Sequence, residues 1–527
     1  MPCLVKYWGS LFFLCTFFTT NIFTQSKIQQ ITIEYADELE GRQEKGLEIK
    51  ILRGNVIVSQ DSVKLYCDSA YLNQSVNIVK AFGSVHINQN DSIHTYSDSA
   101  TYDGNTKIAV LYENVKMTDN TSTLTTDLLT YNLSSKVGTY QNGGKVDNGE
   151  SVLTSELGYY YSNSDEAYFK DSVRLEHPKY KLEADTLLYN TYTDVAYFLG
   201  PTIIYNEKSK VYCEDGYYES KTGLAVFNKN VKFDNPPQFL TADSIYYNRE
   251  TGIGKAYRNV VFRDTAQQVL QFSNFGVYNE IDSTIVSTNG AIAAYIIDKD
   301  TLFIAGDTIR AMQDESEKKT MIVYHNVKIY KDDLQGICDS LFYSDLDSTI
   351  RMFGFPVLWS DSTQFSSDTV FMRLKNKELE RIEMFSNGFI VNYLDSLIYN
   401  QLKGRTIFGY FKDDSLYKVH AIGNGESLYF GQDDTKAYVG INYVQCSEIL
   451  IKVRGNKFSR VSFNLQPVAK FTPMQLANPS DFNLQNLNWE IDIAPQSKED
   501  LLKPLIRSQP TETQENPSLE RSSQNEG

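Results

Sequence analysis

The sequence predicts an all-β protein, an elongated repeat of antiparallel strands, and three observations lead to this fold class. Tyr (36) and Phe (29) are abundant and Pro (13) is scarce, which favours strands over helices. An acidic motif recurs at regular intervals between positions 37 and 368, as expected for a chain of stacked structural repeats. Between these motifs apolar and polar residues alternate, as in half-buried strands bounded by turns.

Charge and composition exclude some classes of protein. The chain has 527 residues, of which 41% are hydrophobic, so it can bury a substantial core. Its 66 acidic residues exceed its 50 basic residues, for a net charge of −16. Because a nucleic-acid binder needs a basic face to displace counterions from phosphates, we expect no nucleic-acid partner.

The segment 1–24 resembles a secretory signal peptide. Lys6 precedes the apolar run Leu11–Phe18, and a polar stretch follows at Thr19–Asn21. The run is shorter than the roughly 20 apolar residues that span a bilayer. We therefore expect cleavage near Thr24–Gln25; an uncleaved N-terminal anchor is the alternative.

The repeat has two landmarks. The first is an acidic residue followed by Ser or Thr, apolar residues and often Tyr-Asn, as in Ala184–Asn190 and Ala242–Asn248. The second is Gly or Asn before Val, as in Gly54–Val56, and in several copies the next Asp follows this Val at the same spacing, as Asp68 follows Val56. One copy cannot bury its apolar face alone, so neighbouring copies must stack.

The recurring Asp could be a calcium ligand or a turn device. Calcium β-rolls need closely spaced Asp and Gly in a nine-residue period, which this sequence lacks. Asp and Ser side chains accept and donate hydrogen bonds to backbone groups at bends. We therefore interpret the motif as a turn device and expect no metal site.

Four cysteines follow the predicted cleavage site: Cys67, Cys213, Cys338 and Cys446. Four in about 500 residues do not make a disulfide scaffold. The first three precede an acidic residue of the repeat, where other copies carry Ala or Ser. We expect small, half-buried side chains there, and the sequence leaves open whether any pair forms a disulfide.

The segment Leu52–Gln60 (LRGNVIVSQ), followed by Leu65–Ala70 (LYCDSA), closely resembles the LptA/OstA family of periplasmic lipopolysaccharide-transport proteins. Ile33–Glu40 (IEYADELE) looks like the first strand of that family. The resemblance is clear over residues 31–280 and fainter over 290–460. This chain departs from the pattern at Cys67, where the family usually has Ala, and it is a long, multi-repeat form.

The resemblance implies a V-shaped (taco-like) β-jellyroll with an apolar interior trough, along which acyl chains of lipopolysaccharide move. It implies a lipid-binding bridge in lipopolysaccharide transport and outer-membrane biogenesis, without cofactor or metal. The residues that alternate toward one face are the candidate lipid-binding positions; a closed core without ligand is the alternative reading of them. They are Val56, Val58, Val63, Leu65, Val85, Ile87, Val115, Met117, Val173, Leu175, Val231 and Phe233.

The resemblance also implies partners and a location. An open jellyroll has unpaired edge strands that add to a neighbour's sheet, and Ile31–Glu34 is the candidate edge strand. The expected partners are the lipid A acyl chains of lipopolysaccharide, LptC-like and LptD-like jellyroll domains, and another copy of this chain. The expected location is the periplasm of a Gram-negative bacterium, in association with the outer membrane.

The predicted organisation has five parts. A signal peptide (1–24) precedes the OstA-like repeats (25–285) and a second, diverged β-repeat domain (286–465). A C-terminal docking segment (466–496) and a disordered tail (497–527) follow, because prolines and polar residues replace the strand pattern there.

No catalytic motif is present in the sequence. The five histidines have no metal-ligand spacing, and there is no nucleophile elbow or phosphate loop. We therefore expect no enzyme. The alternative function is a secreted or surface β-solenoid that binds carbohydrate or another cell-surface ligand, with exposed aromatic residues on its outer face.

Overall fold

The computed structural model describes residues 29–501 except 45–46, 90–92, 119–121, 162–163, 165, 191, 298–299, 315, 317, 376–377, 397, 413–414 and 455–456. The predicted signal peptide and residues 502–527 of the predicted tail lie outside the described residues. The chain forms two compact units, Met1–Asn148 and Gly149–Gly527, which we call the N-terminal and the C-terminal unit. Each is described by itself.

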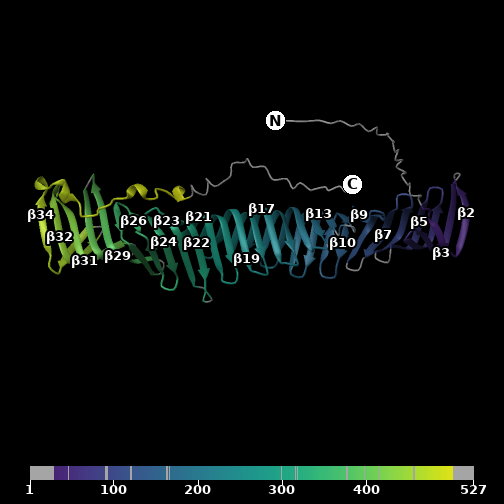
Figure 1. The fold of residues 1–527 in the computed structure, drawn as a ribbon, viewed down its shortest axis with the longest axis horizontal. Coiled ribbons are helices and arrows are strands. Elements are labelled where there is room, and N and C mark those ends of the chain that lie inside the picture. Colours follow the sequence, from purple (N-terminus) through teal and green to yellow (C-terminus); the bar gives the residue numbers. More distant parts are fainter. Residues whose placement is uncertain are drawn as a thin grey trace, which may run out of the picture. The chain divides into compact units, whose positions relative to one another are not determined.

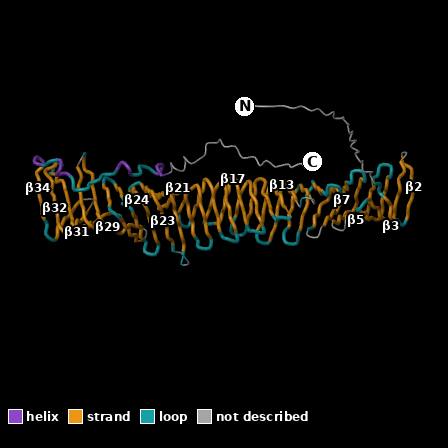
Figure 2. The backbone as a smooth tube through the Cα atoms, in the orientation of Figure 1, coloured by secondary structure: helices purple, strands orange, loops and turns teal. Residues whose placement is uncertain are grey.

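The described residues of the N-terminal unit form ten strands joined by short turns (Figures 1 and 2). The strands are β1 (Thr32–Tyr35), β2 (Glu38–Glu44), β3 (Leu47–Gln60), β4 (Val63–Asn73), β5 (Ile78–Gln89), β6 (Ile93–Asp103), β7 (Ile108–Thr118), β8 (Thr123–Asn132), β9 (Val137–Tyr140) and β10 (Gly144–Asp147).

The described residues of the C-terminal unit form 24 further strands and three short 3-10 helices. The strands are β11 (Val152–Ser155), β12 (Leu157–Tyr161), β13 (Glu166–His177), β14 (Tyr180–Asn190), β15 (Val195–Tyr205), β16 (Lys210–Glu219), β17 (Leu224–Asn235), β18 (Gln238–Asn248), β19 (Ile253–Asp264), β20 (Val269–Asn279), β21 (Thr284–Ile297), β22 (Asp300–Gln313), β23 (Lys319–Lys331), β24 (Leu334–Ser344), β25 (Thr349–Phe353), β26 (Val357–Ser360), β27 (Thr363–Ser366), β28 (Thr369–Lys375), β29 (Glu378–Asp395), β30 (Ile398–Lys412), β31 (Ser415–Gln432), β32 (Tyr438–Arg454), β33 (Lys457–Asn464) and β34 (Val468–Pro473). The helices are η1 (Met474–Leu476), η2 (Pro479–Phe482) and η3 (Ile491–Ile493).

All strand pairings that the structure describes within each unit are antiparallel, and most connect strands adjacent in the chain, such as β3 with β4 and β17 with β18. The predicted all-β fold class is therefore confirmed. The boundary predicted between 285 and 286 lies inside the C-terminal unit, whose contacts continue across it through the pairing of β20 with β21 and of β21 with β22. The division into repeat domains at that point stays a prediction.

The long strands bend near their middle, and in alternate strands the Gly/Asn landmark of the sequence lies at the bend. In β3, Gly54 (φ 74°) and Asn55 (φ 47°) are left-handed, and the register with β4 shifts between Arg53 and Val56. Left-handed residues in one strand make a bulge that kinks it, and Gly and Asn adopt that conformation most readily. The same shift occurs in β17 between Asn228 and Val231. The bends give each jellyroll two walls.

The acidic landmark holds the bend from the neighbouring strand. Asn55 Nδ2 donates a hydrogen bond of 2.9 Å to Asp37 Oδ2, and Asn114 Nδ2 donates one of 2.7 Å to Asp98 Oδ2. In the C-terminal unit Asn259 donates to Asp243 at 3.0 Å. The Asp is thus a bend device, as the sequence predicts, but its partner is an Asn side chain on the next strand rather than a nearby backbone N–H.

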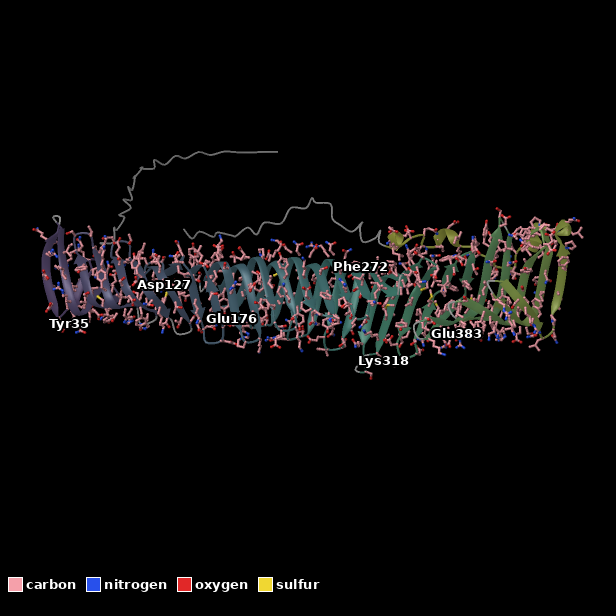
Figure 3. All side chains as sticks on the ribbon, turned by 180° about the vertical axis from the view of Figure 1, so that it is seen from behind. Tyr35, Asp127, Glu176, Phe272, Lys318 and Glu383 are labelled. Carbon is pink, nitrogen blue, oxygen red and sulfur yellow. The ribbon has the colours of Figure 1, made fainter. Side chains whose placement is uncertain are left out.

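The C-terminal segment 474–501, which we call the strap, packs on the outer face of the C-terminal unit. Phe389 and Val391 of β29 contact it, while Ile390 between them packs against the interior core, so the strap lies on the opposite face of the sheet. Figure 1 shows it running back from β34 toward β21, and Phe272, labelled in Figure 3, packs against the cluster around Leu501.

Two buried glutamines hold the strap's main chain. Gln364 donates from Nε2 to Asn488 O at 2.7 Å and accepts from Glu490 N at 2.8 Å. Gln401 donates to Phe482 O at 2.8 Å and accepts from the backbone N–H of Leu484 at 2.8 Å. The predicted docking segment 466–496 comprises β34 and most of this strap.

Candidate functional site

The interior face of each unit follows from the strand register, because residues paired across strands share a face. In the N-terminal unit one wall, which we call wall B, carries a row that runs through consecutive paired strands. The row is Val58, Leu65, Ile87, Thr95 and Met117. The other, wall A, carries a second row. It is Leu72, Val79, Tyr102, Ala109 and Tyr131.

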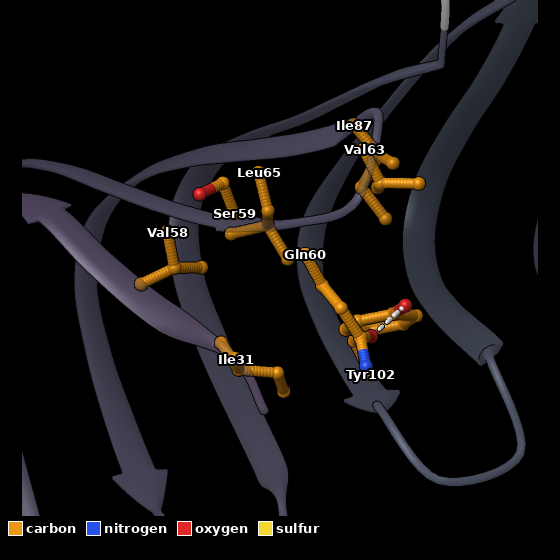
Figure 4. A pocket seen from close by; sticks show the side chains of 8 residues that line it. All are labelled: Ile31, Val58, Ser59, Gln60, Val63, Leu65, Ile87 and Tyr102. Atoms are coloured by element: carbon orange, nitrogen blue, oxygen red, sulfur yellow. Dashed lines mark hydrogen bonds between the residues drawn. The ribbon is translucent and has the colours of Figure 1, made fainter. Parts of the chain in front are cut away.

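The interior of the N-terminal unit is closed. Leu72 and Val79 of wall A are 0% exposed, and Val58 and Leu65 of wall B are 1% and 2% exposed. A small cavity of ≈ 10 Å³, about enough to hold one water, lies in this interior (Figure 4). It is lined by Ile31, Val58, Ser59, Gln60, Val63, Leu65, Ile87 and Tyr102.

Side-chain amides join the two walls at the rim of this unit. Tyr102 of wall A donates to Oε1 of Gln60, which ends β3 on wall B, and Gln60 Nε2 donates to Gly104 O at 2.8 Å. The same arrangement recurs one repeat later. Tyr131 donates to Gln89 Oε1 at 2.9 Å, and Gln89 Nε2 donates to the main-chain O of Leu133 at 3.0 Å.

The interior face of β15–β20 in the C-terminal unit differs in exposure, and we call it the open stretch. Its wall B row is apolar and only partly buried. The row is Ile204, Val211, Phe233, Leu240 and Phe262. Its wall A row alternates tyrosines with small residues. That row is Ala196, Tyr218, Ala225, Tyr247, Gly254 and Tyr278.

The rim tyrosines beside the open stretch bond to acidic residues of their own wall. Tyr247 donates to Glu280 Oε2 at 2.8 Å, and Tyr189 of the preceding β14 donates to Asp194 Oδ1 at 3.0 Å. Burial, with Glu280 as hydrogen-bond partner, raises the pKa of Tyr247 to about 12. Each tyrosine is therefore a neutral donor at neutral pH. Tyr278 remains 42% exposed.

The twelve candidate lipid-binding residues all lie on the interior faces. Eight belong to the N-terminal unit and are buried there: Val56, Val58, Val63, Leu65, Val85, Ile87, Val115 and Met117. Four belong to the C-terminal unit. Of these, Val173 and Val231 lie next to the bends and are buried, while Leu175 and Phe233 lie further out and are partly exposed. Their role toward lipid stays a prediction.

Wall A is the part of the interior that the sequence reasoning did not select. Its residues follow the Asp landmark, and the recurring Tyr-Asn pair was the available signal. Tyr131, Tyr189 and Tyr247 are the tyrosines of that pair, and all lie on the interior face at the rim. The Tyr-Asn pair is visible in the sequence. The face on which its tyrosine lies depends on the bend, because the alternation of interior and exterior residues reverses between the two halves of these strands.

The four cysteines are free thiols, and all four are buried more deeply than predicted. Cys67 in the N-terminal unit is 5% exposed and Cys213 in the C-terminal unit is 1% exposed. Burial raises the pKa of Cys67 to about 11 and that of Cys213 to about 12. Cys67 and Cys213 are therefore unreactive small core residues beside the bends.

Within the described ranges, no group of three or more His, Cys, Asp or Glu side chains is placed to hold a metal ion. Among the same residues there is no helix with the length and apolar character needed to cross a membrane.

These features define a class of protein: a bent, antiparallel β-jellyroll with an apolar interior. Comparison with known families is specific for the first part of the chain. Residues 28–185 and 182–243 match the model of the OstA-like protein family. This part of the chain is therefore similar to the OstA-like family, and the match covers the described residues of the N-terminal unit and the first strands of the C-terminal unit.

A solved structure that resembles part of the chain is LptH from Pseudomonas aeruginosa, described as the LptA-homologous periplasmic component of the lipopolysaccharide transport device. The two sequences are 23% identical over 21% of this chain and 80% of that chain, with a TM-score of 0.19. A match at this level carries no conclusion about ligands or partners. Among curated proteins, none matches this chain.

Proposed function

We propose that this protein carries lipid in lipopolysaccharide transport, holding acyl chains against its apolar interior. The open stretch is the observation that carries the proposal. Its wall B row (Ile204, Val211, Phe233, Leu240, Phe262) leaves apolar side chains partly exposed on an interior face, where a soluble domain without ligand normally completes its packing.

The physical gain from a bound acyl chain is substantial. Each CH2 group that leaves water contributes about 0.8 kcal/mol, so a few methylenes against Phe233 and Leu240 suffice for detectable affinity. Polar sugars attached to the chain stay in water beyond the rim, where Tyr247 and Glu280 provide hydrogen-bonding groups. The interior thus fits a molecule with long apolar chains and a polar head.

Location and partners belong to the same proposal. The signal peptide predicted from sequence and the OstA-like family match support a periplasmic protein. The chain's terminal strands offer edges for β-strand addition to similar jellyroll domains. β1 and β2 pair with β3, and β34 pairs with β32, leaving Val468 and Phe471 68% and 59% exposed.

Photocrosslinking in cells tests the proposal. A photoreactive residue replaces Phe233 or Val211 of the open stretch, and Lys232, which points outward next to Phe233, is the matched control. We expect lipopolysaccharide adducts at Phe233 and Val211 and none at Lys232. If the folded, secreted protein gives no adduct at either interior position, the lipid-carrier function is wrong.

Carbohydrate binding on the outer face is the second candidate function. Tyr66, His86 and Tyr96 stack across three strands of the N-terminal unit, with ring centroids 5.4 and 4.5 Å apart. Tyr96 is 40% exposed. The rings stack mainly on one another, so this surface supports the candidate less strongly than the open stretch supports lipid. Oligosaccharide adducts at Tyr96 without interior adducts would favour it.

A further inference from the structure

We propose that the pairs Gln60–Tyr102 and Gln89–Tyr131 are latches that close the interior of the N-terminal unit and open to admit an apolar chain. The identity of that chain as a lipopolysaccharide acyl group rests on the proposed function. The closure itself does not, because it follows from contacts between the two walls.

Each latch joins the rims of opposite walls. Gln60 lies at the end of β3 on wall B, in the cross-strand row with Val63 and Gln89. Tyr102 lies on wall A, in the row with Leu72 and Val79. A hydrogen bond between them therefore crosses the opening between the walls, and Figure 4 shows it beside the small cavity.

The latches repeat with the period of the sequence. Gln60 and Gln89 occupy equivalent positions in successive copies, as do Tyr102 and Tyr131, so both glutamine–tyrosine pairs have the same separation of 42 along the chain. Both glutamines are buried, at 3% and 8% exposure. Such buried amides need partners, so a closed rim is the state in which they are satisfied.

The same tyrosine of the repeat has a different partner where the interior is open. Tyr247 occupies the position of Tyr131, yet it bonds Glu280 of a loop on its own wall. The wall B rim residue three strands before Tyr247 is Asn206, directly after β15, and its Oδ1 accepts from the backbone N–H groups of Lys208 and Ser209 in its own turn. The choice of partner for one repeated tyrosine thus correlates with a closed or an open interior.

Hydrogen bonds suit a latch because they exchange with water when the rim opens. The interior apolar rows lose contact with each other at the same time, and an acyl chain that enters between Leu65 and Leu72 replaces that contact. The exposed ion pair between Lys107 and Asp61, with Nζ and Oδ2 2.6 Å apart, adds little to closure at physiological salt. At the first latch Gln60 Nε2 also donates to Gln29 O, and Ile31 N donates to Asn77 Oδ1 at 2.8 Å, so the chain before β1 adds to the closure there.

The labelling rates of native cysteines measure the opening of the latches, and this measurement needs no lipid. Cys67 lies in the interior of the latched unit, and Cys213 lies in the interior of the C-terminal unit. The full-length protein with Tyr102→Phe and Tyr131→Phe keeps both rings and loses both hydroxyl donors. We expect the rate at which N-ethylmaleimide labels Cys67, relative to Cys213, to rise about tenfold, which corresponds to about 1.4 kcal/mol.

A second variant, Gln60→Ala with Gln89→Ala, removes the glutamine amides and should raise the labelling rate of Cys67 relative to Cys213 further. The matched control is Tyr247→Phe, which removes the same hydroxyl in the open stretch and should leave the ratio unchanged. A ratio unchanged in both latch variants overturns the proposal. So does a uniform rise at all four cysteines, because it indicates general unfolding rather than opening of one rim.

Photocrosslinking separates the latch from the proposed function. With a photoreactive residue at Val58, we expect weak lipopolysaccharide adducts in the otherwise wild-type protein and strong ones in the Tyr102→Phe, Tyr131→Phe background. Phe233 should give adducts in both. Equal adducts at Val58 in both backgrounds overturn the latch and leave the function standing. Faster labelling of Cys67 without adducts at either position overturns the function and supports the latch.

Discussion

The interior of the N-terminal unit and the open stretch of the C-terminal unit are built from the same repeat, yet one is closed and the other is partly exposed. Both have bends held by an Asn–Asp hydrogen bond, as at Asn114–Asp98 and Asn259–Asp243. They differ at the rim, where the same tyrosine bonds a glutamine of the opposite wall or an acidic residue of its own wall. A repeat can therefore keep its scaffold while its rim residues decide access to the interior.

The wall A rows are alike in both regions beside the rim tyrosine. In the N-terminal unit Tyr131 lies between Ala109 and Gly138 and is 1% exposed. In the open stretch Tyr247 lies between Ala225 and Gly254 and is only partly buried. Small neighbours occur in both regions, so the difference between them lies in the partner of the tyrosine.

The largest expected contrast is between two identical truncations on wall B. Leu65 is 2% exposed, and Leu65→Ala should destabilise the N-terminal unit by about 3 kcal/mol because it leaves a cavity. Leu240 is only partly buried, so Leu240→Ala should cost about 1 kcal/mol. Native-state hydrogen exchange of the β4–β5 and β18–β19 amides measures both. Equal losses would show that the open stretch is packed as tightly as the closed unit.

Two Gly→Ala substitutions compare the stability cost at a bend with the cost in the wall A row. Gly83 is left-handed (φ +75°), and a Cβ there would lie 2.3 Å from Asp68 Oδ2, so Gly83→Ala should cost about 2 kcal/mol or more. In Gly254→Ala the nearest atom, Tyr247 Cδ2, is 3.7 Å from the new Cβ, and we expect a change within about 0.5 kcal/mol. Thermal denaturation followed by circular dichroism compares the two. A large loss of stability in Gly254→Ala would contradict the interpretation that the wall A row of the open stretch is accessible.

The Asn–Asp bond should contribute equally in both regions. Asn114→Gly and Asn259→Gly keep the left-handed backbone and remove the bond to Asp98 or Asp243, each at a cost of about 1 kcal/mol. Urea denaturation of both variants, with Asp98→Ala and Asp243→Ala completing double-mutant cycles, measures the coupling. A coupling confined to one unit would mean that the bends are not equivalent.

A pH dependence confined to the closed unit is the smallest expected effect. Burial lowers the pKa of His86, and the neighbouring His94, whose Nδ1 is 3.1 Å from His86 Nε2, lowers it further. Since the unfolded chain binds this proton more readily, stability of the unit should fall as pH drops below about 6.5, the ordinary value for histidine.

Hydrogen exchange of β5 and β6 at pH 7.5 and 5.5 measures this effect, and His86→Gln should reduce it. The β18–β19 amides of the open stretch serve as the internal reference. If stability changes between pH 7.5 and 5.5 by the same amount in His86→Gln as in the wild type, other groups cause the pH dependence.

Much of the fold could be predicted because its signals are local. Alternation in Val56–Val58 and Val63–Leu65 has the period of a strand, and Gly54-Asn55 marks a left-handed bend within the same strand. These preferences act over a few residues. They place one wall of the interior correctly and identify the bend device.

Contacts between distant residues could not be predicted in the same way. Nothing in the sequence around Gln60 identifies Tyr102 as its partner, and the strap's bond from Gln364 to Asn488 joins residues 124 apart. Such pairs depend on the stagger between walls and on the path of the chain after β34. The alternation alone also leaves the second half of the Asp-bearing strands unassigned, because the interior face changes parity at the bend, from Leu65 and Cys67 to Ala70 and Leu72 in β4.

The sequence by itself determined that this protein is a bent, repeating, antiparallel β-structure with an apolar interior, since each copy of the repeat carries the left-handed bend residues and the period-2 alternation of buried residues. Only the tertiary structure decided where that interior is closed and where it is accessible. The physical reason is that closure depends on which rim groups meet across two walls. The same tyrosine donates to Gln89 across the two walls in one unit, and it donates to Glu280 on its own wall in the other.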